Sequence, residues 1–327
     1  MNASDAVIVA DGLMKSFGKT EALRGLNLEV SADEVHGFLG PNGAGKSTTI
    51  RALLGQLRLN AGTLKVFGLD PWADAVAIHH RLAYVPGDVA LWPNLTGGEV
   101  IDLLLGLRGV PVQDKSRAEL IERYDLDPRK KGRTYSKGNR QKVALVAALA
   151  GEPELLVLDE PTSGLDPLME DVFRECVRER VAAGTTVLLS SHILSEVEQL
   201  CDRVTIIREG TTVESGSLAE LRHLTRTKVH AVTVNPADIS AVPGAEDLLV
   251  SGMTVSGTVP AHSLGALASA LGSAGLTSLE TALPSLEELF RDVYAVGESG
   301  ARRTHRGEEP ESPDNPVGGR HRGAPTS

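Results

Sequence analysis

A glycine-rich run near residue 40 combines residue types suited to holding a chain of phosphates. Phosphate oxygens must lie against backbone N–H groups, so glycine is favoured where a Cβ would intrude. Lys46 can reach the β- and γ-phosphates, and the Ser47 hydroxyl can ligate Mg²⁺. Apolar residues 35–39 precede the run and a helical pattern over 49–54 follows it, which is the context of a P-loop rather than of a chance turn. The run consists of Gly40, Pro41, Asn42, Gly43, Ala44, Gly45, Lys46, Ser47 and Thr48.

Two acids end a second apolar run, residues 155–158. A carboxylate at the end of a buried strand, here Asp159, is placed to bind Mg²⁺ beside the phosphates. The next residue, Glu160, is placed to polarise a water molecule that attacks the γ-phosphate. Alone, this pattern also fits a strand capped by two solvated acids, but the P-loop upstream favours the metal-binding interpretation.

The composition is that of a globular protein, and 327 residues suffice for about two domains. A formal net charge of −10 argues against a broad nucleic-acid-binding surface. Cys176 and Cys201 are far apart, which argues against a metal site or a disulfide and favours a reducing compartment. No apolar run approaches the ~20 residues of a membrane span, and the N-terminus lacks a signal-peptide pattern. We therefore expect a cytoplasmic protein that reaches a membrane only through a partner.

Strand and helix patterns alternate through the first two thirds of the chain, which predicts an α/β core. Residues 6–30 favour β-structure. The runs 155–158 and 186–189 are typical of strands buried on both faces of a parallel sheet. Further strands are expected at 64–67 and 82–85, and helices at 143–150, 167–182 and 193–200. Residues 96–125 have a helical pattern that Gly106, Gly109 and Pro111 punctuate.

The sequence changes character after residue 217. Strand patterns at 229–234 and 254–259 and helical patterns at 263–274 and 284–294 predict a small α+β accessory domain over residues 223–296. Residues 297–327 are rich in Gly, Pro, Arg, Glu and Ser with few apolar residues, which predicts a disordered tail.

A third motif, Tyr135-Ser136-Lys137-Gly138-Asn139, precedes the helical run 143–150. It resembles the signature of ABC-type ATPases, usually LSGGQ, with Ser136 and Gly138 retained and three positions changed. Ser136 would lie in the N-cap region of a helix directed at phosphate. By itself the motif equally fits an ordinary capped helix after a turn.

Motifs elsewhere extend this resemblance. Residues 161–167, PTSGLDP, resemble the family's D-loop, and His192, which follows the run 186–189, resembles its switch histidine. Phe17 stands where the family has an aromatic residue that stacks on adenine, although it also fits a core position. Over about residues 6–222, the ordered series resembles an ABC transporter ATP-binding subunit.

The resemblance implies an ABC-type P-loop NTPase domain over residues 1–222, with a mixed sheet core, an antiparallel β subdomain and a helical subdomain at about 90–150. It implies ATP and Mg²⁺ as cofactors, and a homodimer in which two copies close head to tail around two ATP molecules. Catalytic roles would fall to Glu160, His192 and Lys46, and Mg²⁺ binding to Ser47 and Asp159. Ser136 and Gly138 of the second copy would complete each site.

The chain departs from the family where a glutamine normally follows a strand, in a loop that touches Mg²⁺ and the membrane subunit. Gly87 occupies that place and offers no side-chain ligand. The adjacent Asp88 is either a substitute ligand for the metal or its water, or part of a plain turn. The replacement bears on coupling and hydrolysis rate more than on nucleotide binding.

Three stretches resemble the drug- and antibiotic-export subfamily, which includes daunorubicin-resistance and tetronasin-type exporters: residues 284–290, residues 91–97 and the Ser136-Lys137-Gly138 variant. In that subfamily the ATPase works as a homodimer with a separately encoded ABC-2-type permease, so the chain would lie on the inner face of the cell membrane without inserting. The accessory domain would stabilise the dimer or regulate it.

Other P-loop functions fit less well. DNA-repair types carry a long coiled coil between the P-loop and the acids, and residues 47–159 hold no sustained heptads. Translation types usually carry two cassettes, and a GTPase would need an Asn-Lys-x-Asp motif, which does not occur. An ABC-type ATPase with a regulatory or non-transport role and slow hydrolysis remains the alternative.

Overall fold

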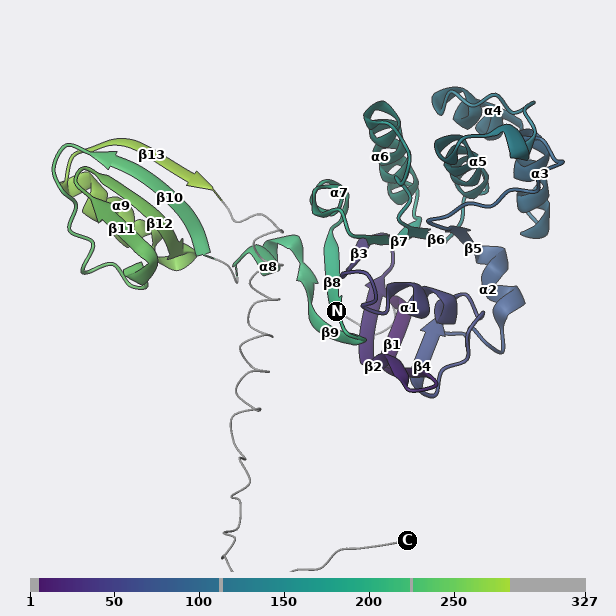
Figure 1. Ribbon diagram of the computed structural model, residues 1–327, viewed down its shortest axis with the longest axis horizontal. Helices are drawn as coiled ribbons and strands as arrows, with labels where there is room; N and C mark the ends of the chain where they lie inside the picture. Colours follow the sequence, from purple (N-terminus) through teal and green to yellow (C-terminus); the bar gives the residue numbers. More distant parts are fainter. Residues whose placement is uncertain (1–5, 112–113, 224–225, 283–327) are drawn as a thin grey trace, which may run out of the picture. The chain divides into compact units, whose positions relative to one another are not determined.

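The computed structural model describes residues 6–111, 114–223 and 226–282 (Figure 1). No helix in these three ranges is long and apolar enough to cross a membrane. The helix predicted at 284–294 and the tail predicted at 297–327 lie outside the described residues.

A six-stranded sheet in the order β5-β6-β7-β3-β8-β9 forms the centre of the first part of the chain. All neighbours pair in parallel except β8 and β9. Every residue of β3 and β7 is buried, as the continuous apolar runs predict. The strands are β3 (Val35–Leu39), β5 (Leu82–Val85), β6 (Leu155–Asp159), β7 (Thr186–Ser191), β8 (Arg203–Arg208) and β9 (Thr211–Ser217).

A second, antiparallel sheet in the order β2-β1-β4 packs into the same core. Its strands are β1 (Ala6–Phe17), β2 (Thr20–Ser31) and β4 (Ala61–Val66). Ile8, Leu26 and Val66 from this sheet join Phe38 of β3 and Ile50 of the helix α1 (Lys46–Leu53) in one buried cluster. This shared core fixes the start of α1 against both sheets. Strand β4 ends one residue earlier than predicted, because Phe67 turns to a left-handed backbone conformation, with φ 54°.

Three helices form the layer predicted at about 90–150: α3 (Gly97–Leu107), α4 (Asp114–Arg123) and α5 (Lys137–Ala150). A capping box starts α3, because the Thr96 side chain accepts from the Glu99 backbone while the Glu99 carboxylate accepts from Thr96. Every residue of α5 from Gln141 to Ala150 is buried. Two short elements remain in this part of the chain: α2 (Ala75–Arg81), which precedes the layer, and the 3-10 turn η1 (Gly132–Thr134), which lies between α4 and α5 in the sequence.

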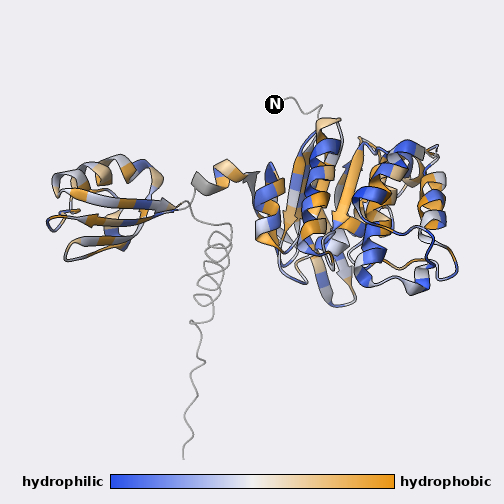
Figure 2. Ribbon diagram, turned by 90° about the horizontal axis from the view of Figure 1, so that it is seen from above, coloured by the Kyte–Doolittle hydropathy of each residue, from blue (hydrophilic) through white to orange (hydrophobic). Residues whose placement is uncertain are grey.

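The helix α6 (Pro167–Ala182) has the predicted bounds. Asp166 caps it by accepting from the Met169 backbone, and Pro167 occupies the first turn, where no N–H is needed. The helices α7 (Leu194–Leu200) and α8 (Leu218–His223) follow. Figure 2 shows the strands of this part as mainly hydrophobic and its helices with both hydrophobic and hydrophilic residues, as expected for helices that cover a sheet.

Residues 226–282 form a four-stranded antiparallel sheet with one helix packed on it. Its order is β11-β12-β10-β13, with Val229, Ala231 and Val255 buried against Leu267 and Leu271. The sequence patterns found β10, β12 and α9 but missed both edge strands, whose residues are largely exposed. The elements are β10 (Arg226–Thr233), η2 (Ala245–Asp247), β11 (Leu248–Ser251), β12 (Thr254–Pro260), η3 (Ala261–Ser263), α9 (Leu264–Ser273) and β13 (Leu276–Ala282).

Replacing a fully buried phenylalanine should destabilise the fold much more than replacing an exposed one. Phe173 of α6 is 0% exposed, so Phe173→Ala should lower the free energy of unfolding by about 3–5 kcal/mol. Phe17 is 50% exposed, and Phe17→Ala should change that free energy by less than about 1 kcal/mol. Denaturant unfolding of both variants measures the difference, and equal losses would contradict this description of the core.

Candidate nucleotide-binding site

The glycine-rich run joins β3 to α1 and encloses a small cavity. The cavity has a volume of about 140 Å³ and is lined mainly by backbone and short side chains of the run. Gly43 and Gly45 have φ of 83° and 111°, a region that side chains rarely adopt. A Cβ on Gly45 would also lie 3.0 Å from the Ala22 carbonyl oxygen. The lining residues are Ala22, Pro41, Asn42, Gly43, Gly45, Lys46, Ser47, Thr48 and Glu160.

Lys46 is buried at the first residue of α1, with 6% of its surface exposed. Its ammonium donates to the carbonyl oxygens of Gly40 and Pro41, the latter at 3.2 Å. Burial lowers the pKa of Lys46, while the negative charges of Glu160 and Asp159 act to raise it. The ammonium therefore lies in a field set by both predicted acids, although they are more than 100 residues away in the sequence.

Asp159 ends β6, and burial raises the pKa of its carboxyl, with the neighbouring charge of Glu160 adding to the effect. Lys46 and Arg51 oppose this rise. A half-buried carboxylate next to a second carboxylate is a place where a divalent cation is favoured, because the cation offsets both charges. With the Ser47 hydroxyl on the cavity wall, the oxygen donors fit Mg²⁺, which commonly takes one or two protein oxygens together with phosphates and water.

Glu160 and His192 lie against each other after adjacent strands. The His192 Nδ1 is 3.0 Å from a Glu160 carboxylate oxygen, and 54% and 33% of the two side chains are exposed. Glu160 has φ 49°, a left-handed conformation that is uncommon outside glycine. Its backbone N–H donates to the Ser190 carbonyl at 2.8 Å. Backbone strain of this kind persists where the surroundings hold it, which is typical of functional sites.

The residues that resemble the ABC signature belong to a different part of the domain. Ser136 caps α5, as predicted, and its Oγ accepts from the Asn139 backbone N–H at 3.3 Å. The Lys137 ammonium donates to the Ser163 hydroxyl at 2.6 Å, and Gly138 lies so close to the Gly164 carbonyl that a Cβ would clash. The signature segment therefore packs on the D-loop segment of its own chain. Figure 1 shows α5 well apart from α1.

Phe17 is the last residue of β1 and is half exposed, with the Lys15 ammonium 5.2 Å from the ring centroid. The core interpretation of Phe17 is therefore wrong. An exposed ring leaves a face on which adenine can stack, so that assignment stays a prediction.

Comparison with known proteins decides the family. The ABC transporter family matches residues 23–163. The chain is 37% identical over 303 residues to "Daunorubicin resistance ATP-binding protein DrrA3" of Streptomyces coeruleorubidus, which covers 88% of this chain and 95% of that protein. The chain belongs to the ABC transporter ATP-binding proteins. It is an ATPase of the P-loop type, with the ABC fold predicted from its motifs.

Two further similarities agree. The chain is 41% identical over 219 residues to "Daunorubicin/doxorubicin resistance ATP-binding protein DrrA" of Streptomyces peucetius, covering 66% of each protein. A solved structure, "Structure of ATP binding subunit of ABC transporter", matches with a TM-score of 0.63 at 30% identity, covering 67% of this chain and 92% of that one.

The loop that lacks the usual ABC glutamine lies directly against the acids. An ideal Cβ on Gly87 would be 3.0 Å from the Asp159 carbonyl oxygen and 3.5 Å from the Glu160 Cβ. A side chain at position 87 would therefore press on the end of β6, which explains why glycine fits there. Asp88 is exposed.

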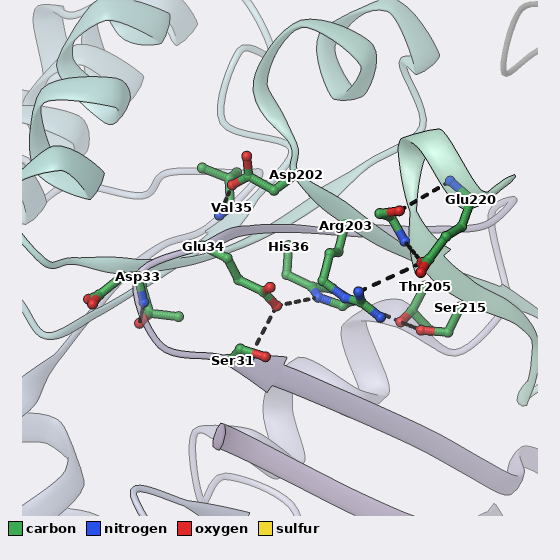
Figure 3. A network of polar contacts seen from close by, with 12 residues as sticks. Ser31, Asp33, Glu34, Val35, His36, Asp202, Arg203, Thr205, Ser215 and Glu220 are labelled. Atoms are coloured by element: carbon green, nitrogen blue, oxygen red, sulfur yellow. Dashed lines mark hydrogen bonds and ion pairs between the residues drawn. The ribbon is translucent and has the colours of Figure 1, made fainter. Parts of the chain in front are cut away.

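Two positioning groups were not found from the sequence. Gln141 of α5 is 1% exposed and its Nε2 donates to the Pro86 carbonyl at 3.4 Å, which ties the signature helix to the loop before Gly87. His36 of β3 is fully buried and links Glu34, at 2.9 Å, to Thr205, at 2.8 Å (Figure 3). The His36 contacts tie the strand that leads into the P-loop to β8. His36 sits in an apolar run, where its polarity is a signal, whereas Gln141 lies among other polar residues and nothing in the sequence sets it apart.

Replacing the buried lysine should remove nucleotide affinity. Lys46→Ala deletes the ammonium next to the phosphate cavity, and charge-assisted hydrogen bonds are worth about 1.5–3 kcal/mol, so ATP should bind roughly tenfold or more weakly. Fluorescence anisotropy with labelled ATP measures this. Lys130→Ala, an exposed lysine, is the control, and wild-type affinity in Lys46→Ala would refute the phosphate-binding assignment.

Asp88→Ala tests whether the acid next to Gly87 serves the metal or its water. It is the sole acid in the segment 86–93, so its loss should lower ATP turnover while leaving ATP affinity unchanged. Steady-state ATPase assays and equilibrium binding separate the two quantities. If turnover and its stimulation by the membrane partner both stay at wild-type values, Asp88 is an ordinary turn residue.

Proposed function

We propose that this chain is the ATP-hydrolysing motor of a two-component exporter that expels a drug or antibiotic-like compound through a separately encoded ABC-2-type permease. The observation that carries this proposal is the extent of one similarity. The match to a daunorubicin resistance ATP-binding protein runs over 303 residues, well beyond the cassette and into the accessory segment. A generic ATPase would share the cassette alone.

The hydrolytic machinery would be divided between two copies of the chain. One copy would supply Lys46, Ser47 and Asp159 for the phosphates and Mg²⁺, and Phe17 for adenine. When bound, Mg²⁺ would neutralise part of the phosphate charge. The other copy would supply Ser136 and Gly138 at the N-terminus of α5. Support comes from the separation of α5 from α1 within one chain, since a phosphate at Lys46 leaves the signature helix N-terminus free for another ligand.

Glu160 would act on the attacking water, and His192 would hold the Glu160 carboxylate in position. The 3.0 Å contact between the two side chains supports these roles, as does the left-handed backbone that aims Glu160 toward the cavity wall it helps to form. Lys46 would keep the β- and γ-phosphates against the loop. Each of these groups acts through position and charge, which is how phosphoryl transfer is generally accelerated.

The same proposal assigns roles to the two domains and a location to the chain. Residues 1–222 would form the nucleotide-binding domain and residues 223–296 an accessory domain that stabilises the dimer or regulates it. The chain would sit in the cytoplasm at the inner face of the cell membrane, held there by its permease. A regulatory ATPase with slow hydrolysis is the competing assignment, and the turnover of the purified chain distinguishes the two.

Glu160→Gln tests the motor directly. The amide keeps the shape of the side chain but cannot accept a proton, so turnover should fall about 100-fold or more while ATP still binds. A closed dimer should then accumulate with ATP, measurable by size-exclusion chromatography. Glu119→Gln, on the exposed face of α4, is the matched control. Turnover close to that of the control would remove Glu160 from the chemistry.

A further inference from the structure

A buried carboxyl contacts both of the segments that carry Glu160 and His192. Glu196 belongs to the helix α7, and only 6% of its surface is exposed. Its Oε2 accepts a hydrogen bond from the Ser191 hydroxyl at 2.6 Å. The Thr162 hydroxyl is near enough to lower the pKa of the same carboxyl. Glu196 therefore meets the residue before His192 and the turn that follows Glu160.

The side chains of Glu160 and His192 lie beyond the end of the sheet that brings them together. Asp159 and Ser190 are the last residues paired between β6 and β7. After this pair, the Glu160 backbone makes one further contact, from its N–H to the Ser190 carbonyl. Both side chains are partly exposed, so core packing does not fix the 3.0 Å contact between them. The contact therefore depends on how the two segments beyond the strands are held.

On the histidine side, Ser191 fixes the turn that contains His192. The Ser191 Oγ accepts from the Ile193 backbone N–H at 3.0 Å while it donates to Glu196. One hydroxyl thereby ties the residues on both sides of His192 to the buried carboxyl. Ser191 is 1% exposed, so water has little access to these hydrogen bonds.

On the acid side, Thr162 lies in the turn that follows Glu160. The Ser163 N–H donates to the Glu160 carbonyl at 3.2 Å, which closes this turn around Pro161 and Thr162. Thr162 is buried. A change in the position of Thr162 is passed on to the left-handed backbone at Glu160, because only one residue separates them.

Stability alone does not account for a carboxyl in this place. Burial raises the pKa of Glu196, and the hydroxyls of Ser191 and Thr162 lower it. Smaller effects come from two charges on α6, since Glu170 raises this pKa and Arg174 lowers it. The Oε1 of Glu196 has no hydrogen-bond partner among the described residues. A buried carboxyl with an unused acceptor costs free energy compared with an apolar side chain of similar size, so what it positions explains it better.

We propose that Glu196 is a positioning residue for ATP hydrolysis. Its carboxyl joins the segments at Thr162 and Ser191. This connection sets the distance between the Glu160 carboxylate and the His192 imidazole. The inference rests on the proposed function, because it takes Glu160 as the group that acts on the attacking water. The carboxyl and both hydroxyls lie outside the lining of the phosphate cavity, so their loss should lower turnover and leave ATP affinity unchanged.

Two replacements of Glu196 separate the connection from the charge. Glu196→Leu removes both acceptor oxygens with little change in volume, whereas Glu196→Gln removes the charge but keeps an oxygen that accepts from the Ser191 hydroxyl. Glu119→Gln, exposed on α4, is the matched control. Steady-state ATPase assays of the full-length variants give kcat and KM for ATP, and fluorescence anisotropy with labelled ATP gives the affinity.

We expect Glu196→Leu to lower kcat roughly tenfold or more, with KM and ATP affinity unchanged, because small displacements of a catalytic group are costly. Glu196→Gln should recover most of the kcat, and the control should keep all of it. A folded leucine variant whose kcat lies within about twofold of that of the glutamine variant overturns the proposal.

The imidazole of His192 gives a second readout that does not need hydrolysis. In a chain labelled with ¹⁵N-histidine, the His192 signals are identified by their loss in His192→Ala, and Glu160→Ala shows where they lie when the contact is absent. They should move toward that position in Glu196→Leu and stay in place in Glu196→Gln. Unmoved signals in the leucine variant contradict the positioning role.

Two smaller changes decide the question if the leucine variant does not fold. Ser191→Ala and Thr162→Val each remove one hydroxyl from the carboxyl, and each should lower kcat about threefold or more at unchanged ATP affinity. Wild-type kcat in both variants refutes the role of Glu196 alone. A wild-type chain that does not hydrolyse ATP refutes the proposed motor function instead, and the His192 signals then still test the positioning role.

Discussion

The parallel register of β6, β7 and β3 is the constraint on which the nucleotide site depends. Leu39 pairs with Ser191, and Asp159 pairs with Ser190, so three strands end at one edge of the sheet. The P-loop, the two acids and the histidine each follow one of these ends. Because β3 and β7 are buried on both faces, the fit of side chains of different size on each face, rather than an alternation of apolar and polar residues, holds this register and hence the site.

The same edge explains how the site can communicate with the rest of the domain. Gly87 touches the end of β6 from one side, while the Glu160 backbone donates to the β7 residue Ser190 on the other. Gln141 reaches the residue before Gly87 from the signature helix. A small shift of α5 would therefore be passed on to the two acids through these contacts, because closely packed groups leave little free space.

The sequence predicted much of this fold because its core elements have strong periodic patterns. The continuous apolar runs at 155–158 and 186–189 and the capped helix from Pro167 fall where expected. The edge strands β11 and β13 were not predicted, because their residues are mostly exposed and no core imposes an alternation of apolar and polar residues on them. The motifs indicated that Glu160 lies with Lys46 at the cavity and beside His192. They could not indicate the contacts of Gly87 or Gln141, because each depends on the approach of segments distant in the chain.

The backbone conformation of Glu160 has a consequence for how this protein can vary. A left-handed residue other than glycine carries a conformational cost, and glycine at this position would relieve it while deleting the carboxylate. If Glu160 acts on the attacking water, as proposed, selection for thermal stability and selection for turnover favour different residues at position 160. Under that proposal, a laboratory search for heat-resistant variants of this chain would meet a conflict at that residue, because the glycine variant with the more relaxed backbone would lack the carboxylate that acts on water.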